Sequence, residues 1–209
     1  MSSTFSLEGK NAVVTGLSTG IGRAIAEALA REGANVAGDY QKDAEGAAIT
    51  QRLIEAHGRE ALIVQGSTAD EAHIDDLADQ VVERWGSLDI WVNNAARIFV
   101  KPFIELESEE WHGLLAANLH GYMYGCRAAA RRMATQNSPG RIINITSQSD
   151  VQAISGMSAY ITAKGGINAM TRTLALELAP YDITVNAVSP GPTDTPLNTT
   201  AWTPKARQT

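Results

Sequence analysis

Cysteine, aromatic residues and long apolar runs are all scarce in this sequence of 209 residues. Cys126 is its single cysteine, so no disulfide can form within the chain, which fits a reducing compartment. No run approaches the roughly 20 consecutive apolar residues that a membrane helix needs. The first residues also lack the basic start and apolar core of a secretory signal. We therefore expect a cytoplasmic protein without a membrane partner.

Positive charge is also in short supply, with 17 Lys and Arg against 23 Asp and Glu and a formal net charge of -6. Nucleic acids and anionic membranes attract basic surfaces, so this balance argues against both as partners. The four histidines are scattered and form no cluster with carboxylates, so we expect no metal site and interpret them as surface or packing residues: His57, His73, His112 and His120.

Apolar residues make up 44% of the chain and charged residues 19%, which is typical of a globular protein. Short apolar runs alternate with longer amphipathic ones, and this pattern predicts strands and helices in turn. The expected strands are 11–15, 35–40, 61–65, 88–92, 141–146 and 183–188. The expected helices are 21–31, 44–57, 71–85, 108–133 and 158–179. The alternation indicates one α/β domain over residues 1–209, built on a doubly wound parallel sheet. Ligands of such sheets bind beyond the carboxyl ends of the strands.

A glycine-rich turn joins the first expected strand to the first helix, with the sequence Thr-Gly-Leu-Ser-Thr-Gly-Ile-Gly over residues 15–22. Glycine lets the backbone approach a phosphate closely, and the helix N-terminus offers unpaired N–H groups. An ordinary strand-to-helix turn is the alternative, but the position in the first unit of an alternating chain favours a dinucleotide. The expected contacts are Gly16, Ser18, Thr19, Gly20, Ile21 and Gly22.

Tyr160 and Lys164 are four residues apart near the start of an expected helix and therefore share a face of it. An ammonium beside a phenol lowers the phenol pKa from its usual value of about 10. Such a phenol can exchange a proton with an alcohol or a carbonyl compound. Ser147, at the end of the preceding strand, offers a hydroxyl to the reacting oxygen. The alternatives are a chance surface pair and a helix cap or loop serine.

The glycine spacing and the set Ser147, Tyr160 and Lys164 resemble those of the short-chain dehydrogenase/reductase family. Asn118, a poor helix former inside an expected helix, matches the fourth catalytic member, with a solvent-facing position as the alternative. The resemblance implies a Rossmann fold and hydride transfer between NAD or NADP and a small alcohol or carbonyl compound. It makes Tyr160 the general acid or base and Lys164 the group that tunes it and binds the nicotinamide ribose. Ser147 would polarise the substrate oxygen, and Asn118 would hold a relay water.

The resemblance also implies further contacts with the cofactor and with the substrate. Residues 93–96 resemble the family's segment beside the adenosine, with Ala96 in place of glycine, and residues 189–195 resemble the segment that holds the nicotinamide carboxamide. The implied cofactor contacts are Asn94, Ala95, Ala96, Pro190, Gly191, Thr193 and Thr195. The expected substrate contacts, besides Ser147 and Tyr160, are Gln148, Ser149, Gln152 and Met157. The neighbourhoods of Thr19, Tyr40 and the pair Gly165 and Gly166 resemble those of bacterial sugar and polyol dehydrogenases, including glucose dehydrogenases, which favours a sugar or a polyol.

The adenosine end departs from the family pattern. Tyr40 stands where the family usually has the acid that binds the ribose 2′-hydroxyl, and Asp39 comes one residue early. Gln41 and Lys42 complete the expected contacts at this strand. Lys42 favours NADP, with a solvated loop lysine as the alternative, so NAD stays open. Two further contacts are expected after the third strand, Ser67 in place of the family's aspartate and the adjacent Thr68, and Asp70 is interpreted as a helix cap.

The chain stops about one helix and one strand short of the family pattern. One interpretation is a sheet without its last strand, which leaves an exposed edge, and the other is a longer protein. A dinucleotide-binding protein without catalysis, an inactive truncated chain and a nucleotide-sugar epimerase are the alternative functions. We expect a homodimer or homotetramer formed through the helices at 108–133 and 158–179. The apolar residues expected at that interface are Tyr122, Met123, Met170 and Leu174.

Overall fold

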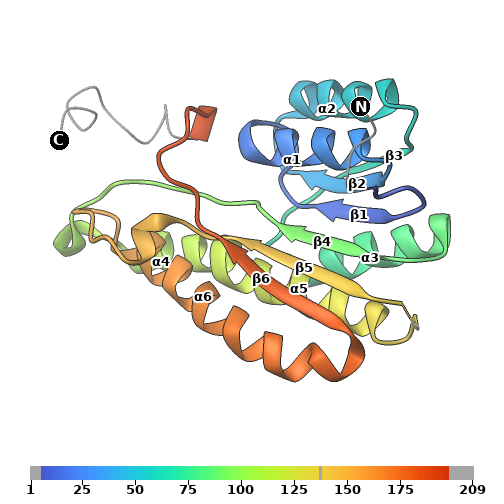
Figure 1. Cartoon of the computed structure of the whole chain (residues 1–209). Coiled ribbons are helices and arrows are strands. Elements are labelled where there is room, and N and C mark those ends of the chain that lie inside the picture. The colour runs from blue at the N-terminus through green and yellow to red at the C-terminus, as the bar shows by residue number, and fades with distance from the viewer. Residues whose placement is uncertain (1–5, 137, 198–209) are drawn as a thin grey trace.

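The computed structural model describes residues 6–136 and 138–197 and contains a six-stranded parallel sheet (Figure 1). The strands are β1 (Asn11–Val14), β2 (Asn35–Tyr40), β3 (Ala61–Gln65), β4 (Ile90–Asn93), β5 (Gly140–Ile145) and β6 (Ile183–Val188). Their order, β3-β2-β1-β4-β5-β6, reverses between β1 and β4. This topology confirms the predicted doubly wound fold, and it places a ligand crevice beyond the carboxyl ends of β1 and β4.

Helices cover both faces of the sheet (Figure 1). One face carries α1 (Gly20–Arg31) and α2 (Ala44–Ala56), and the other carries α3 (Glu71–Trp85), α5 (Gly121–Met133) and α6 (Ser158–Leu178). A short helix, α4 (Ser108–Leu115), leads into α5. Strands buried on both faces need apolar residues at nearly every position, which explains the continuous apolar runs of the sequence.

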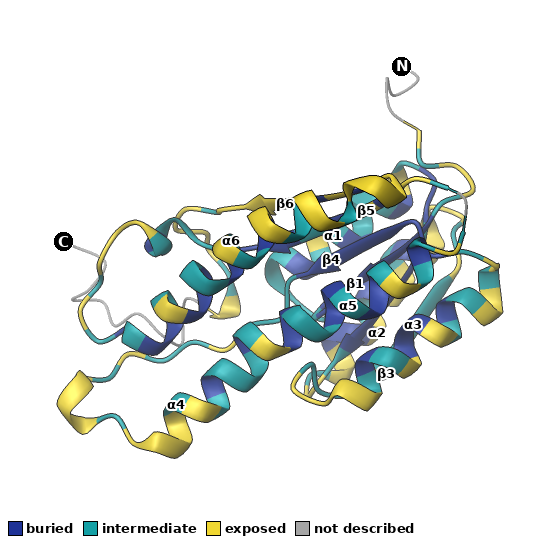
Figure 2. Ribbon diagram, turned by 90° about the horizontal axis from the view of Figure 1, so that it is seen from below, coloured by how far each residue is buried: buried dark blue, intermediate teal, exposed yellow. Residues whose placement is uncertain are grey.

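Two apolar clusters hold these layers together. One packs Leu77 and Val81 of α3 and Met133 of α5 against Trp91 of β4. The other lies under α1 and α2 and includes Ala26, Ala30 and Ile54. Figure 2 shows the buried residues along the central strands and along the sides of α3, α5 and α6 that face them. The strand ends at the crevice are therefore fixed by the core.

The expected continuous helix over 108–133 is interrupted. A π-helical turn, Ala116–His120, separates α4 from α5, and α4 has Glu107 as its N-cap. The Glu110 carboxylate accepts a hydrogen bond from the Glu107 N–H at 3.0 Å. Asn118 lies in the middle of the π-helical turn and is fully buried. A π-helical turn inside a helix is frequently found at a functional site.

Strand β6 pairs only with β5 and forms the edge of the sheet within residues 6–136 and 138–197. Ile183 and Val185 are buried, whereas the alternate residues Thr184, Asn186 and Val188 are exposed.

No helix in the described part of the chain is long and apolar enough to cross a membrane. The helix caps support the same layout, since the predicted cap residue Asp70 accepts a hydrogen bond from the Ala72 N–H at 3.0 Å.

Candidate active site

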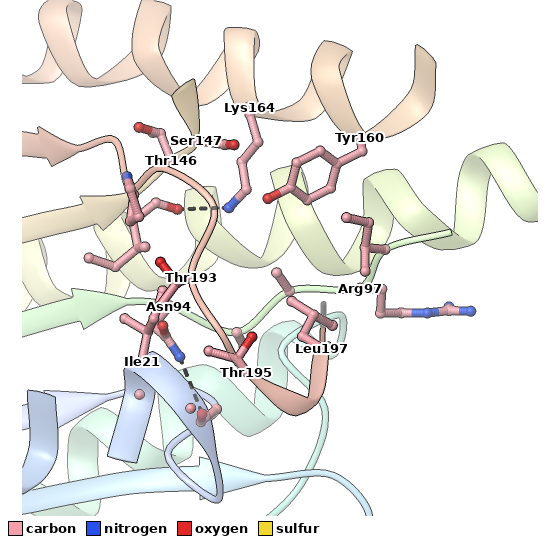
Figure 3. A pocket seen from close by; sticks show the side chains of 18 of the residues that line it. Ile21, Asn94, Arg97, Thr146, Ser147, Tyr160, Lys164, Thr193, Thr195 and Leu197 are labelled. Carbon is pink, nitrogen blue, oxygen red and sulfur yellow. Dashed lines mark hydrogen bonds between the residues drawn. The ribbon is translucent and has the colours of Figure 1, made fainter. Parts of the chain in front are cut away.

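A cavity of about 800 Å³ lies beyond the carboxyl ends of the strands (Figure 3). Most residues predicted from the sequence to bind cofactor or substrate line it: Gly16, Ser18, Thr19, Gly20, Ile21, Gly22, Gln41, Ser67, Thr68, Asn94, Ala95, Ala96, Ser147, Gln148, Ser149, Gln152, Met157, Tyr160, Lys164, Pro190, Gly191, Thr193 and Thr195. Three predicted residues are not among the lining residues: Tyr40, Lys42 and Asn118. The elements that meet here are far apart in the sequence, so the fold assembles the site.

The glycine-rich turn forms a close-packed cradle at one end of the cavity. Gly16 has a φ of 68°, and a Cβ there would lie 2.8 Å from the Ala95 Cα atom. A Cβ at Gly22 would collide with the Gly16 carbonyl oxygen. The N-cap of α1, Thr19, makes no side-chain cap hydrogen bond, and the first turn of α1 has no acidic residue. Its first N–H groups therefore receive no hydrogen bond from the Thr19 side chain, and the cradle fits the pyrophosphate of a dinucleotide.

Asp39 of β2 lines the cavity and hydrogen-bonds to the backbone of this cradle. One of its carboxylate oxygens accepts a hydrogen bond from the Gly16 N–H at 2.7 Å, and the other lies 3.3 Å from His73 Nε2. The hydrogen bond to the Asp39 carboxylate raises the pKa of His73, against the effect of burial. His73, interpreted from the sequence as a surface or packing residue, thus belongs to the support of the site. The signal that could have found this pair was an acid inside a strand that is otherwise apolar.

Asn94 joins β4 to the same turn. Its side-chain amide donates to the carbonyl oxygens of Thr15 at 2.9 Å and Gly16 at 3.2 Å. A dashed line from Asn94 in Figure 3 marks a contact of this amide with the turn. In return the Thr15 hydroxyl accepts from the N–H groups of Asn94 and Ala95. Ala96 has no positive φ, so alanine fits where the family has glycine.

Tyr160 and Lys164 reach into the other end of the cavity from one face of α6, with Ser147 beside them at the end of β5 (Figure 3). Lys164 is 1% exposed, and its Nζ donates to the Ile145 carbonyl oxygen at 2.7 Å. The same Nζ lies 5.7 Å from the centre of the Tyr160 ring. The Ser147 hydroxyl oxygen accepts a hydrogen bond from the Ser149 N–H at 3.2 Å, which leaves its proton available to another acceptor.

Burial controls the pKa values of both side chains. It raises the pKa of Tyr160, while a hydrogen bond with Ser147 acts in the opposite direction. It lowers the pKa of Lys164 to about 7. We expected the Lys164 ammonium to lower the pKa of Tyr160, and this expectation is wrong, because the net effect in the fold is a raised pKa. The reason is that both groups lose water, and the lysine itself is partly neutral near pH 7.

The Asn118 side chain is hydrogen-bonded to the backbone of Arg97 on both sides. Its Oδ1 accepts from the Arg97 N–H at 2.7 Å, and its Nδ2 donates to the Arg97 carbonyl oxygen at 2.8 Å. The solvent-facing alternative is wrong, because the residue is fully buried. The amide holds the segment that follows β4, and that segment lines the cavity. Asn118 therefore positions a wall of the site.

Several lining residues were not among the contacts predicted individually: Asp39, Gly66, Arg97, Ile98, Ala117, Ile145, Thr146, Ile154, Pro192, Asp194 and Leu197. Pro192 and Asp194 lie inside the predicted segment 189–195, and the others, apart from Asp39, carry no motif of their own. Many directly flank predicted residues, so their position in the chain was the available signal. Ile98 and Ile154 pack with Tyr160 in an apolar cluster that forms one wall.

Comparison with known proteins gives consistent matches. Residues 10–206 match the family model described as short chain dehydrogenase. The chain is 39% identical to 3beta-hydroxysteroid dehydrogenase 1 of Eggerthella lenta, over 96% of this chain and 77% of that protein. It is 37% identical to glucose 1-dehydrogenase 2 of Bacillus subtilis, over 97% and 79% respectively. A short-chain dehydrogenase from Burkholderia cenocepacia, solved in complex with NADP, superposes with a TM-score of 0.90 at 38% identity, over 97% of this chain and 81% of that one.

Proposed function

Because this chain belongs to the short-chain dehydrogenase family, and is thus an NAD(P)-dependent oxidoreductase acting on CH–OH groups, we propose that it interconverts a sugar or polyol and the corresponding carbonyl compound. One observation carries the proposal. The proton-transfer set Ser147, Tyr160 and Lys164 lies at one end of a single cavity whose other end is the phosphate cradle. A dinucleotide-binding protein without catalysis would not need that set.

Each side chain has a role that its contacts support. The Tyr160 hydroxyl gives its proton to a carbonyl oxygen during reduction, or takes the proton of an alcohol during oxidation. The Ser147 hydroxyl holds the same oxygen, with its own oxygen fixed by the Ser149 N–H. Lys164 has an N–H free to face the cavity, where it would bind the ribose hydroxyls of the cofactor. When bound, the nicotinamide ring gives or accepts the hydride.

The cofactor would lie along the length of the cavity. The turn from Gly16 to Gly22 would hold the pyrophosphate, and residues from Pro190 to Thr195 would hold the carboxamide end. The adenosine would lie against Gln41 and Ser67, whose side chains hydrogen-bond to each other at 3.3 Å.

We further propose that the protein prefers NAD to NADP. Of the residues at the ends of β2 and β3, those that line the cavity are Asp39, Gln41, Gly66, Ser67 and Thr68. This set holds a buried carboxylate and no lysine or arginine. Lys42, which favoured NADP from the sequence, is not among the lining residues. A 2′-phosphate here would meet negative charge without a lining cation.

Titration of the chain with each cofactor tests this preference. We expect NAD to bind at least about tenfold more tightly than NADP, equivalent to roughly 1.4 kcal/mol. Asp39→Asn should reduce the difference in affinity, because it removes the negative charge that disfavours the 2′-phosphate. The cradle should persist, since an asparagine oxygen can still accept from the Gly16 N–H. The control Lys42→Ala should leave the difference in affinity unchanged. Tighter binding of NADP, or a loss of NADP affinity in Lys42→Ala, would refute the preference.

The substrate class rests on the polar side of the cavity. Gln148, Ser149 and Gln152 line it beside Ser147 and offer donors and acceptors to several hydroxyl groups. The apolar lining residues Ile98 and Ile154 favour a second candidate, an apolar secondary alcohol such as a hydroxysteroid. The names of the two relatives quoted above span these two classes.

Initial rates of NAD reduction with glucose, sorbitol and xylitol, compared with a 3β-hydroxysteroid, separate the candidates. The proposal predicts a kcat/KM for at least one polyhydroxylated substrate about tenfold or more above that for the steroid, a difference of about 1.4 kcal/mol in transition-state binding. A faster reaction with the steroid would replace the proposal by the second candidate.

We also propose that the chain forms a homo-oligomer through the α4–α5 and α6 helices. Leu176 of α6 is 80% exposed, which leaves a large apolar side chain to cover. The prediction that Tyr122 lies at this interface is wrong, since its side chain is 1% exposed inside the fold. Met170 and Leu174 are partly buried and pack against the core. Sedimentation velocity at micromolar concentration should show a dimer or tetramer, and a monomer alone would refute the proposal.

A further inference from the structure

A second tyrosine, Tyr122 of α5, lies directly beside Lys164 of α6. It is 1% exposed, and its hydroxyl donates a hydrogen bond to the Ile145 carbonyl oxygen at 2.8 Å. Lys164 Nζ lies 3.0 Å from the same hydroxyl oxygen and 2.7 Å from the same carbonyl oxygen. Because the hydroxyl proton points to Ile145, the hydroxyl oxygen presents a lone pair to the ammonium.

Tyr122 contacts the ammonium with its ring as well. Lys164 Nζ lies 4.6 Å from the centre of the Tyr122 ring, compared with 5.7 Å for Tyr160. At this distance the face of an aromatic ring attracts a cation, most strongly in a site without water. Two of the three ammonium N–H groups are thus used on Tyr122 and Ile145, and the third remains for the cavity that Lys164 lines.

From this triangle of atoms we propose that Tyr122 is a positioning residue, which fixes Lys164 Nζ between the end of β5 and the cavity and favours its charged form. The inference rests on the proposed function, in which Lys164 assists Tyr160.

Few other groups near Lys164 could hold its ammonium in place or favour its charged form. The titratable groups nearest to this pair are Cys126 of α5 and Tyr160 of α6, and burial raises the pKa of both, that of Cys126 to about 12. Burial likewise raises the pKa of Tyr122, so neither Tyr122 nor Cys126 carries a negative charge at neutral pH. Strand β5 contributes only a backbone carbonyl, and no ion pair joins Lys164 to a carboxylate in the described part of the chain. The hydroxyl, the ring and the carbonyl therefore act alone against the cost of burial.

Tyr122→Phe tests the inference, because it keeps the ring and removes only the hydroxyl. The pKa of Lys164 can be read directly by NMR from the ε-carbon resonance of ¹³C-labelled lysine, assigned with Lys164→Met. We expect Tyr122→Phe to lower that pKa by about half a unit to one unit, since a lost hydrogen bond disfavours the charged form. Tyr124→Phe is the matched control on the same helix, where Tyr124 instead lies beside Arg127, and it should leave the pKa unchanged.

Kinetics give a second measurement. A less charged Lys164 supports the Tyr160 phenolate less well, so the pH at which alcohol oxidation reaches half its maximum should rise in Tyr122→Phe, with kcat about tenfold lower at neutral pH. The KM for the alcohol should stay nearly constant, because Tyr122 does not line the cavity. An unchanged Lys164 pKa with an unchanged pH profile would overturn the inference. If the NMR shift is found in a chain without dehydrogenase activity, the positioning role stands and the proposed function fails.

Discussion

Tyr160→Phe is expected to lower kcat for alcohol oxidation by about 10³-fold, in the middle of the range that general acid–base catalysis contributes. The variant loses the hydroxyl that exchanges the proton, while the ring stays packed with Met157 and Ala163. The cradle for the pyrophosphate lies at the other end of the cavity, so the dissociation constant for NAD should change by no more than about twofold.

Stopped-flow turnover and calorimetric titration with NAD measure the two quantities on the same preparation. Tyr40→Phe is a suitable control, because Tyr40 ends β2 without lining the cavity. It should keep both turnover and cofactor affinity. If Tyr160→Phe kept more than about a tenth of the wild-type rate, a loss of only about 1.4 kcal/mol, another group would have to carry the proton.

Lys164→Met is expected to make the protein more stable and much less active. Burial lowers the pKa of Lys164 from 10.5 to about 7, and each pKa unit corresponds to about 1.4 kcal/mol. Methionine removes the buried charge at similar length, and the Ile145 carbonyl oxygen keeps its hydrogen bond from Tyr122. We expect the free energy of unfolding at neutral pH to rise by on the order of 3 kcal/mol.

The sign of its pH dependence follows from linkage. Between about pH 7 and pH 10 the unfolded wild-type chain binds a proton at Lys164 that the folded chain does not, so wild-type stability gains from rising pH. The variant lacks this titration. Its advantage should therefore be largest below about pH 7, decrease as the pH rises, and disappear only above 10.5, where the lysine is neutral in both states.

Urea unfolding of both proteins at pH 6.5 and pH 9, followed by tryptophan fluorescence, gives the difference directly. Turnover should fall by about 10²-fold or more, since Tyr160 loses its partner. A variant less stable than wild type at pH 6.5 would show that Lys164 is charged and well compensated in the fold. A stable variant with full activity would remove Lys164 from the catalytic set.

Local patterns were enough for the layered fold. For example, the apolar run at 183–188 was predicted to be the last strand, and it forms β6, Ile183–Val188. The glycine spacing also predicted the cradle, because the positive φ of Gly16 and the closeness of Gly22 to the Gly16 carbonyl oxygen are local to the turn. Both features depend on residues close in sequence, where apolar periodicity and turn chemistry are informative.

Contacts between distant segments were beyond the sequence. The helix expected over 108–133 is interrupted where Asn118 bonds to Arg97, 21 residues earlier. Asp39 supports Gly16 across 23 residues, and no motif marks that bond. Tyr122 was assigned to an interface as surplus apolar surface, whereas its hydroxyl finds buried partners 23 and 42 residues away. The direction of the Tyr160 pKa also depends on burial, which only the assembled fold determines.

The most direct test of the central claim is a crystal structure of this chain grown with NAD. The account predicts the pyrophosphate between Gly16 and Gly22 at the start of α1, with the nicotinamide ring beside Tyr160 and the ribose hydroxyls at Lys164 Nζ. A dinucleotide bound elsewhere, or turned so that the nicotinamide lies at the Asp39 end, would contradict it.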